Sequence, residues 1–167
     1  GVYDPGSDTY NSRGTHGEGS FAFAGAALAP TGEIVFAPRG SDNVGVYDPV
    51  SYSYPSGPSH DEGSSAFNGA ALTQTGEVVF APNDSLNVGV YDPATQTYTA
   101  VGHSEGTSAF RGAALSPTGE VVFAPEDSSN VGVYDPATET YTSGDTHGAG
   151  TAAFRGAALA PTGEIVF

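Results

Sequence analysis

The sequence predicts an all-β fold, a β-propeller built from four-stranded blades of about 44 residues. The first observation behind this prediction is an internal repeat, because the phrase "GVYDP" recurs at steps of 44, 44 and 43 residues, starting at Gly1, Gly45, Gly89 and Gly132. Two other phrases, "GAAL" and "TGE", recur in the same register in every unit. Repeats of 40 to 50 residues that hold four short strands are typical of propeller blades.

Each unit contains four strand signals separated by turn signals. In the last complete copy they are "FRGAAL", "EVVFAP", "NVGVYDP" and the short "TYT". The turn "SPTG" follows the first strand, the polar loop "EDSS" follows the second, and the Asp-Pro pair ends the third. A Gly-rich connection, "SGDTHGAG", leads to the next unit. No interval between these breakers leaves room for a helix of ten or more residues.

The predicted blades must pack face to face around an axis, because one small sheet cannot bury both of its faces alone. The small residues of "GAAL" suit the innermost strand, where blades crowd together. The larger "VVF" and "VYD" segments suit the wider outer layers. A β-solenoid or an open stack of hairpins is the alternative, but solenoid coils usually run shorter per turn.

The unit boundaries divide the chain into four blade equivalents. We predict a single propeller domain, or part of one, over residues 1–167, with units at 1–22 (partial), 23–66, 67–109, 110–153 and 154–167 (partial). The N-terminal part supplies strands three and four, and the C-terminal part supplies strands one and two. Three arrangements stay open: four blades that close on themselves, a window from a longer array, and two chains that self-associate into one larger ring. The start within a unit and the absent initiating Met favour the window.

The repeats resemble those of kelch-like β-propeller proteins. The segments "VYDPATQTYT" and "VYDPATETYT" resemble the end of a kelch blade, although one Gly followed by two Ala stands where a kelch blade has paired glycines. Over the whole unit, the skeleton "GA.L.P.G...F.P....N.G.YDP" is similar to kelch-like repeat proteins of microbes and protists. That resemblance implies a propeller and implies no particular reaction.

The composition excludes several classes of function. Four arginines and no lysine face 19 acidic residues, which gives a net charge of −15 and argues against nucleic acid or anionic lipid as a partner. The absence of cysteine excludes disulfides and thiolate metal sites. No apolar run approaches the ~20 residues of a membrane-spanning segment. The acidity favours an extracellular or cell-surface setting, with the cytoplasm left open.

The loops between strands two and three are the variable part of the repeat. They read "RGSD", "NDSL" and "EDSS", and strand alternation places them on one face with the long connections, around the mouth of the central channel. The opposite face carries the repeated "TG" and "YDPAT" turns. Variation on one rim of a constant scaffold is what a binding face looks like.

One histidine occupies the same position in every unit. An acidic residue follows two positions later in the first three units but is replaced by Ala149 in the fourth; the residues concerned are His16, His60, His103, His147, Glu18, Glu62 and Glu105. A His and a carboxylate this close on a loop suit a divalent metal such as Zn. The alternative is that each His packs or hydrogen-bonds within its own blade, a role that recurs with every blade.

Loop acids form a second candidate set. Asp42, Asp84 and Asp127 each precede an Asn. Asp and Asn at turns usually bond their own backbone. Oxygen ligands for calcium are the other interpretation, so a divalent cation, Ca or Zn, is the only cofactor that the sequence suggests.

Strand one carries a third set, because Arg111 and Arg155 stand where the other copies have Ala24 and Asn68. An arginine buried there requires an anionic partner, which we expect to be an acid of a neighbouring blade or an anionic ligand. The single glycosylation sequon, at Asn83, predicts a surface position for that loop if the protein is secreted.

The functional hypothesis is a non-catalytic propeller that serves as a scaffold or recognition module. Its acidic loop face would meet a protein, a glycan or divalent cations. The alternative is an enzyme or metal-binding propeller that uses the His/Glu ring at the channel mouth. No spacing in the sequence identifies a catalytic residue.

Overall fold

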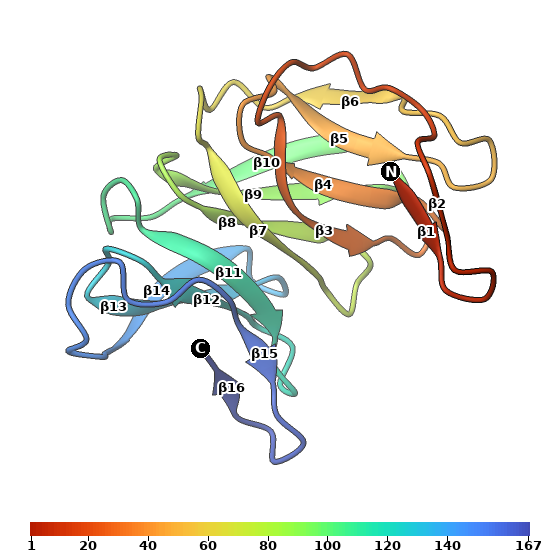
Figure 1. Cartoon of the computed structure of the whole chain (residues 1–167). Coiled ribbons are helices and arrows are strands. Elements are labelled where there is room, and N and C mark those ends of the chain that lie inside the picture. Colours follow the sequence, from red (N-terminus) through yellow and green to blue (C-terminus); the bar gives the residue numbers. More distant parts are fainter.

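The computed structural model describes all residues, 1–167, and consists of strands, turns and loops (Figure 1). Three four-stranded antiparallel sheets follow one another along the chain, each in simple sequential order. Blade A consists of β3 (Phe23–Leu28), β4 (Ile34–Pro38), β5 (Asn43–Tyr47) and β6 (Ser56–Ser59). Blade B consists of β7 (Phe67–Leu72), β8 (Val78–Pro82), β9 (Asn87–Asp92) and β10 (Thr97–Gly102). Blade C consists of β11 (Phe110–Leu115), β12 (Val121–Pro125), β13 (Asn130–Asp135) and β14 (Thr140–Thr146).

Two further strand pairs stand at the ends of the chain. The N-terminal pair is β1 (Val2–Asp4) with β2 (Thr9–Asn11), and the C-terminal pair is β15 (Ala158–Leu159) with β16 (Ile165–Val166). Figure 1 shows the blades arranged along an arc with the two termini far apart. The all-β propeller architecture predicted from the repeat is therefore confirmed. No helix long and apolar enough to cross a membrane is present.

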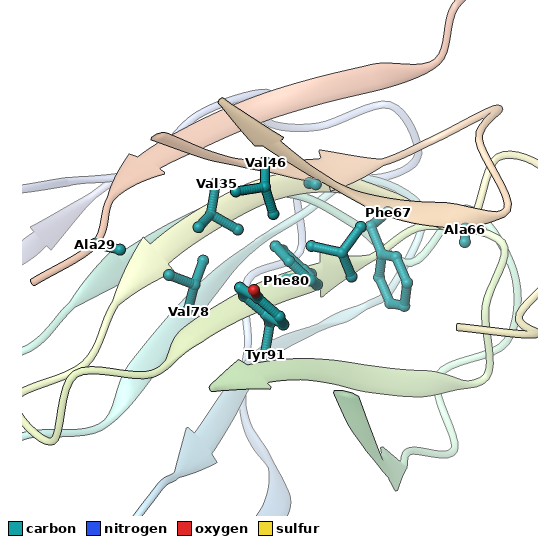
Figure 2. Close-up of a cluster of buried hydrophobic side chains, with 10 residues drawn as sticks. Ala29, Val35, Val46, Ala66, Phe67, Val78, Phe80 and Tyr91 are labelled. Carbon is teal, nitrogen blue, oxygen red and sulfur yellow. The ribbon is translucent and has the colours of Figure 1, made fainter. Parts of the chain in front are cut away.

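The core lies between blades, and each blade has two different faces. Blade A presents Val35, Val44 and Val46 to blade B, with Ala29 and Ala37 beside them. Blade B packs larger side chains against them, among which are Phe67, Val78, Phe80 and Tyr91. Figure 2 shows the cluster that the two blades form together. The same pairing of a small face with an aromatic face recurs between blades B and C. Strand alternation produces both faces, because successive residues point to opposite sides of the sheet.

The "YDP" turn closes strands three and four by local hydrogen bonds. In blade B, the carboxylate of Asp92 accepts the backbone N–H of Ala94 at 2.8 Å and the hydroxyl of Thr95 at 2.7 Å. The hydrogen bonds from Thr95 and Ala94 lower the pKa of Asp92. Gln96 then adopts a left-handed conformation, with φ of 57°. The repeated Asp is thus an Asx-type turn residue in every copy.

The fourth strand differs from the short "TYT" predicted. In blades B and C, β10 and β14 continue beside the whole of strand three, and the last pair in blade C is Asn130 with Thr146. In blade A, β6 begins only at Ser56, because Pro55 has no N–H to donate to a ladder. The outer strand therefore follows the length of its partner rather than its own propensity.

The inner strands approach one another backbone to backbone. β7 contacts β3 and β11, and β11 also contacts β15. A Cβ placed on Gly112 would lie 2.7 Å from the Cα of Gly156, and one on Gly69 would lie 2.8 Å from the carbonyl oxygen of Arg111. These distances are too short for any side chain, so the Gly of "GAAL" is required by the close approach of blades at the axis.

We predict that Gly112→Ala destabilises the fold by about 1 to 3 kcal/mol, because the methyl group overpacks against backbone that has little room to move. Gly102→Ala, in the outer strand β10, is the matched control, since the nearest atom to a Cβ there is the side-chain oxygen of Asn87 at an ordinary contact distance of 3.7 Å. Chemical denaturation of both variants measures the difference. Equal stabilities would show that the inner strands are not in close contact.

Candidate functional site

The predicted loop face is held together by backbone hydrogen bonds. The loop between strands two and three lies against the connection that leads into strand one of the same blade. The N–H groups of Arg39, Asn83 and Glu126 donate at 2.8 Å to the carbonyls of Ala22, Ala66 and Ala109. These two segments therefore form one continuous surface at one end of the blades.

Each repeated histidine has both ring nitrogens engaged where its blade is complete. The Nδ1 of His103 accepts the backbone N–H of Glu105 at 3.2 Å, so the ring proton belongs on Nε2. That Nε2–H donates to the carbonyl of Ser85 at 3.0 Å. His60 and His147 make the same pair of bonds, at 2.7 and 2.8 Å to the carbonyls of Ser41 and Ser128. The histidine thereby ties the end of strand four to the loop of its own blade.

The imidazole also packs against the next blade. The ring centroids of His103 and Phe110 are 5.9 Å apart, and those of His103 and Tyr141 are 5.5 Å apart. His60 lies in the same way against Phe67 and Tyr98. One side chain thus bonds to one blade and covers the aromatic side chains of its neighbour.

The glutamate of the H-x-E-G pattern continues this bridge. Glu62 accepts hydrogen bonds from the hydroxyl of Ser85 at 2.7 Å and the side-chain amide of Asn87 at 2.9 Å, both in blade B. The hydroxyl of Tyr98 donates to the same carboxylate at 3.3 Å. Burial and the nearby Glu62 charge raise the pKa of Tyr98.

Glu105 repeats the arrangement on blade C. Burial alone would raise the pKa of Glu105, but hydrogen bonds from Ser143, Ser128 and Asn130 lower it below its ordinary value. The fourth copy has Ala149 in place of this acid. The H-x-E-G pattern is therefore an inter-blade clamp in this structure, and the repeat explains it without a ligand.

The histidines are not gathered into a metal site. No group of three or more His, Asp or Glu side chains lies close enough to hold a metal ion. The imidazole nitrogens that would bind Zn are occupied by backbone groups in His60, His103 and His147. His16 keeps the bond from the N–H of Glu18, at 3.1 Å, and is exposed.

We predict that His103→Ala lowers the free energy of unfolding by about 2 to 3 kcal/mol, from two hydrogen bonds and the aromatic contacts. His16→Ala should cost less, about 1 kcal/mol, because that imidazole also lies against Phe23 and Tyr54 but is exposed and has no acceptor at Nε2. Urea denaturation of the two variants makes the comparison. A larger loss in His16→Ala would contradict the clamp.

The three loop aspartates do not occupy equivalent places. Asp84 and Asp127 align with each other, and their counterpart in blade A is Gly40, whereas Asp42 lies two residues further along the loop. Asp84 Oδ1 accepts the N–H and hydroxyl of Ser108 at 3.2 and 3.3 Å, and Asp127 Oδ1 accepts the N–H of Ala152 at 2.8 Å. Asp42 directly precedes Asn43, whereas Leu86 and Ser129 directly precede the Asn in the other two loops.

Arg111 has an acidic partner, although not the one expected. It forms an ion pair through Nε with Glu126, in the loop of its own blade rather than a neighbouring one. The hydrogen bond with Glu126 raises the pKa of Arg111. Blade B contributes to the same cluster, since the side-chain amide of Asn83 donates to Glu126 at 3.1 Å. A buried carboxylate is thus satisfied by one cation and one amide.

The remaining predicted residues lie apart from this pair. Asn68 is half-buried and its side-chain nitrogen has no hydrogen-bond partner, while Arg155 is exposed near the C-terminal pair. Asn83 is only 6% exposed, so the sequon does not present its asparagine at the surface as expected. The amide is hidden because it serves Glu126.

Sequence reasoning missed a hollow on the loop face of blade A. It is lined by Phe21, Arg39, Gly40, Ser64 and Ser65, which we call the Phe21 pocket, and has a volume of about 200 Å³. The available signal was departure from the repeat: Phe21 stands where other copies have Ser or Ala, and Gly40 stands where they have Asp. The motifs of the repeat were taken from residues that recur, so Phe21 and Gly40 were not among the candidates.

No protein-family model matches the sequence, and no curated protein matches it. Solved structures do match the fold. Virginiamycin B lyase from Staphylococcus aureus has a TM-score of 0.73 at 12% identity, over 86% of this chain and 47% of that one. Hydrazine synthase of Kuenenia stuttgartiensis has a TM-score of 0.69 at 15% identity, over 89% of this chain and 42% of that one.

A binding protein shares the same fold. An auxiliary nutrient binding protein from Bacteroides ovatus has a TM-score of 0.64 at 16% identity, over 87% of this chain and 36% of that one. This chain therefore spans about half or less of the length of these neighbours. At such identities the likeness shows the propeller fold alone, and the kelch-like character of the repeat stays a prediction.

Proposed function

We propose that this propeller is a non-catalytic recognition module whose loop face binds a protein, a glycan or a divalent cation. One observation carries the proposal: on a scaffold of nearly constant repeat length, the loop face holds a cluster of positions whose residues differ from copy to copy. They occupy the second-to-third strand loop, the connection and the start of strand one, namely Phe21, Ala24, Arg39, Gly40 and their counterparts in the other copies. A constant set of strands with variable loops at one end is the arrangement expected of a binding surface.

The repeated polar residues are already used by the fold. The histidines and glutamates of the H-x-E-G pattern bond to backbone and to serine and asparagine side chains of the blades. The aspartates of the "YDP" turns bond their own turns. Residues that serve every blade interface equally are poor candidates for one specific ligand.

The enzyme or metal-binding alternative has less support. It relies on the His/Glu ring, and the nitrogens and oxygens that it needs are engaged between blades. A lyase and a nutrient binding protein both occur among structures of similar fold, so the fold favours neither function. An extracellular or cell-surface setting is part of our proposal, since acidic, lysine-free surfaces suit it.

The first test is a binding panel of neutral and acidic glycans, Ca²⁺, Zn²⁺ and cationic peptides. Once a ligand is found, Asp42→Ala and Arg155→Ala, both exposed on the loop face, are expected to weaken binding about tenfold in at least one variant. Gln74→Ala, exposed at the opposite end of the blades, is the control and should bind normally.

Three results would count against the proposal. A ligand lost with Gln74→Ala but kept with both loop-face variants would move the site to the other face. Turnover of any glycan or ester in a hydrolase and lyase panel would make the module catalytic. A panel in which no member binds the wild-type chain would remove the recognition function.

We also propose that the chain self-associates through its end pairs. Val166 is 56% exposed, whereas its counterpart Val35 is fully buried against blade B. Blade A in turn leaves its aromatic face open in a hollow of about 570 Å³ that includes Phe23, Phe36 and Tyr54. The C-terminal pair of one copy therefore offers the side chains that blade A of another copy lacks.

The similarity to structures of about twice this length supports a second copy as the occupant, since the arc matches about half of such a propeller. We expect native mass spectrometry of residues 1–167 to give twice the mass of one chain. Val166→Asp should shift the mass to that of a single chain, because it places a charge in the shared face. A wild-type monomer at high concentration would refute the association.

A further inference from the structure

Three residues that lie together in blade A differ from their counterparts in the sister blades. Phe21 replaces a Ser or Ala, Arg39 replaces Asn or Glu, and Gly40 replaces Asp. Phe21 precedes strand one and the adjacent Arg39 and Gly40 follow strand two, yet together with Ser64 and Ser65 they line the Phe21 pocket. Three departures from the sister blades at one hollow indicate a site that only this blade carries.

The sister blades show what this position holds when it is closed. In blade B, the carboxylate of Asp84 accepts both the N–H and the hydroxyl of Ser108 in the following connection. In blade C, Asp127 accepts the N–H of Ala152. The connection therefore offers donors that, in both sister blades, are matched by a carboxylate of the protein itself.

In blade A the carboxylate is missing. Gly40 has no side chain, so Ser65, the counterpart of Ser108, has no acidic partner, and the hollow opens between them. Arg39 adds a positive charge to the same hollow. Arg111 is the one arginine with a carboxylate within 4 Å, so Arg39 has no ion-pair partner. An arginine beside unused N–H and O–H donors is a site that suits a carboxylate from outside.

Phe21 gives the pocket an apolar wall. Its side chain is 81% exposed, and its backbone has φ of 55°, a conformation that the sister residues Ser65, Ser108 and Ala152 share. The fold thus requires this backbone conformation at the position but does not require an aromatic side chain, and the ring of Phe21 is not packed into the core. The guanidinium carbon of Arg39 lies 5.9 Å from the centre of this ring, so the cation and the platform face one ligand-sized space.

From these contacts we propose that the Phe21 pocket binds a uronate, a sugar ring that bears one carboxylate, at the end of a glycan. The proposal deepens the recognition function and rests on it. The carboxylate takes the place of the missing Asp, between Ser65 and Arg39, and the face of the ring lies on Phe21. A volume of about 200 Å³ suits one ring rather than a longer segment. The net charge of −15 disfavours a polyacidic peptide, which the whole protein repels.

The experiment uses glucuronate as the probe and the sister blades as the source of variants. Phe21→Ser, Arg39→Asn and Gly40→Asp each install a residue that the fold already carries at the equivalent position. Binding is followed by NMR chemical-shift changes and calorimetry, with glucose as the neutral control. We expect glucuronate to bind the wild type at least tenfold more tightly than glucose.

Each variant should weaken glucuronate binding about tenfold or more while leaving the melting temperature within a few degrees of wild type. Gly40→Asp is the sharpest, because it returns the protein's own carboxylate to the donors of Ser65. A Cβ there lies 3.0 Å from the carbonyl oxygen of Phe21, so Gly40→Ala controls for crowding and should keep most of the affinity.

Several outcomes would overturn the proposal. They are equal binding of glucose and glucuronate, unchanged binding in the triple variant, or tighter binding of an acidic peptide with the same dependence on the three residues. If the panel yields another ligand that the triple variant still binds, this site is wrong while the recognition function stands. If nothing binds the wild type, the recognition function itself has failed.

Discussion

A four-stranded sheet of this size has two apolar faces and buries neither by itself, so every blade depends on its neighbours. The faces are not alike: valine and alanine point one way, and phenylalanine and tyrosine point the other. Each small face accepts the aromatic face of the next blade, which fixes the direction of the array. At the axis, Gly69 and Gly112 let the inner strands touch backbone to backbone. These two requirements constrain the residues of the blade faces and of the inner strands.

The H-x-E-G pattern supplies hydrogen-bond partners to polar groups at the same interface. The end that carries the long connections has no strand ladder to close it, so polar groups there require partners. His103 bonds back to the loop of blade B, while Glu105 reaches forward to Ser128 and Asn130 of blade C. Together the His and the Glu bond to the preceding and the following blade, so the pair recurs with each interface. These bonds give the repeated His and Glu a role in every complete interface between blades.

The sequence was sufficient for the fold and insufficient for the partners of polar side chains. Repeat length and turn chemistry are local properties, so strands such as Val121–Pro125 could be placed from them. The acceptor of an imidazole or the anion beside Arg111 depends on how loops of neighbouring strands meet, which no spacing encodes. Asp42 lies two residues further along its loop than Asp84 and Asp127 along theirs, so loops of equal length can hold the acid at different places. Phe21 was missed because a repeat directs attention to what recurs.

The position shared by Arg39, Asn83 and Glu126 shows how function can arise on such a scaffold. In blade C the acid is neutralised by Arg111 and receives a hydrogen bond from Asn83, so its charge is balanced within the protein. In blade A the cation has no acid, the neighbouring aspartate is absent, and an aromatic ring stands exposed beside them. This loop can carry such a site because its residues differ among the three blades, while the faces between the blades keep the same apolar pattern. A bound carboxylate would supply the negative charge that this site of blade A lacks.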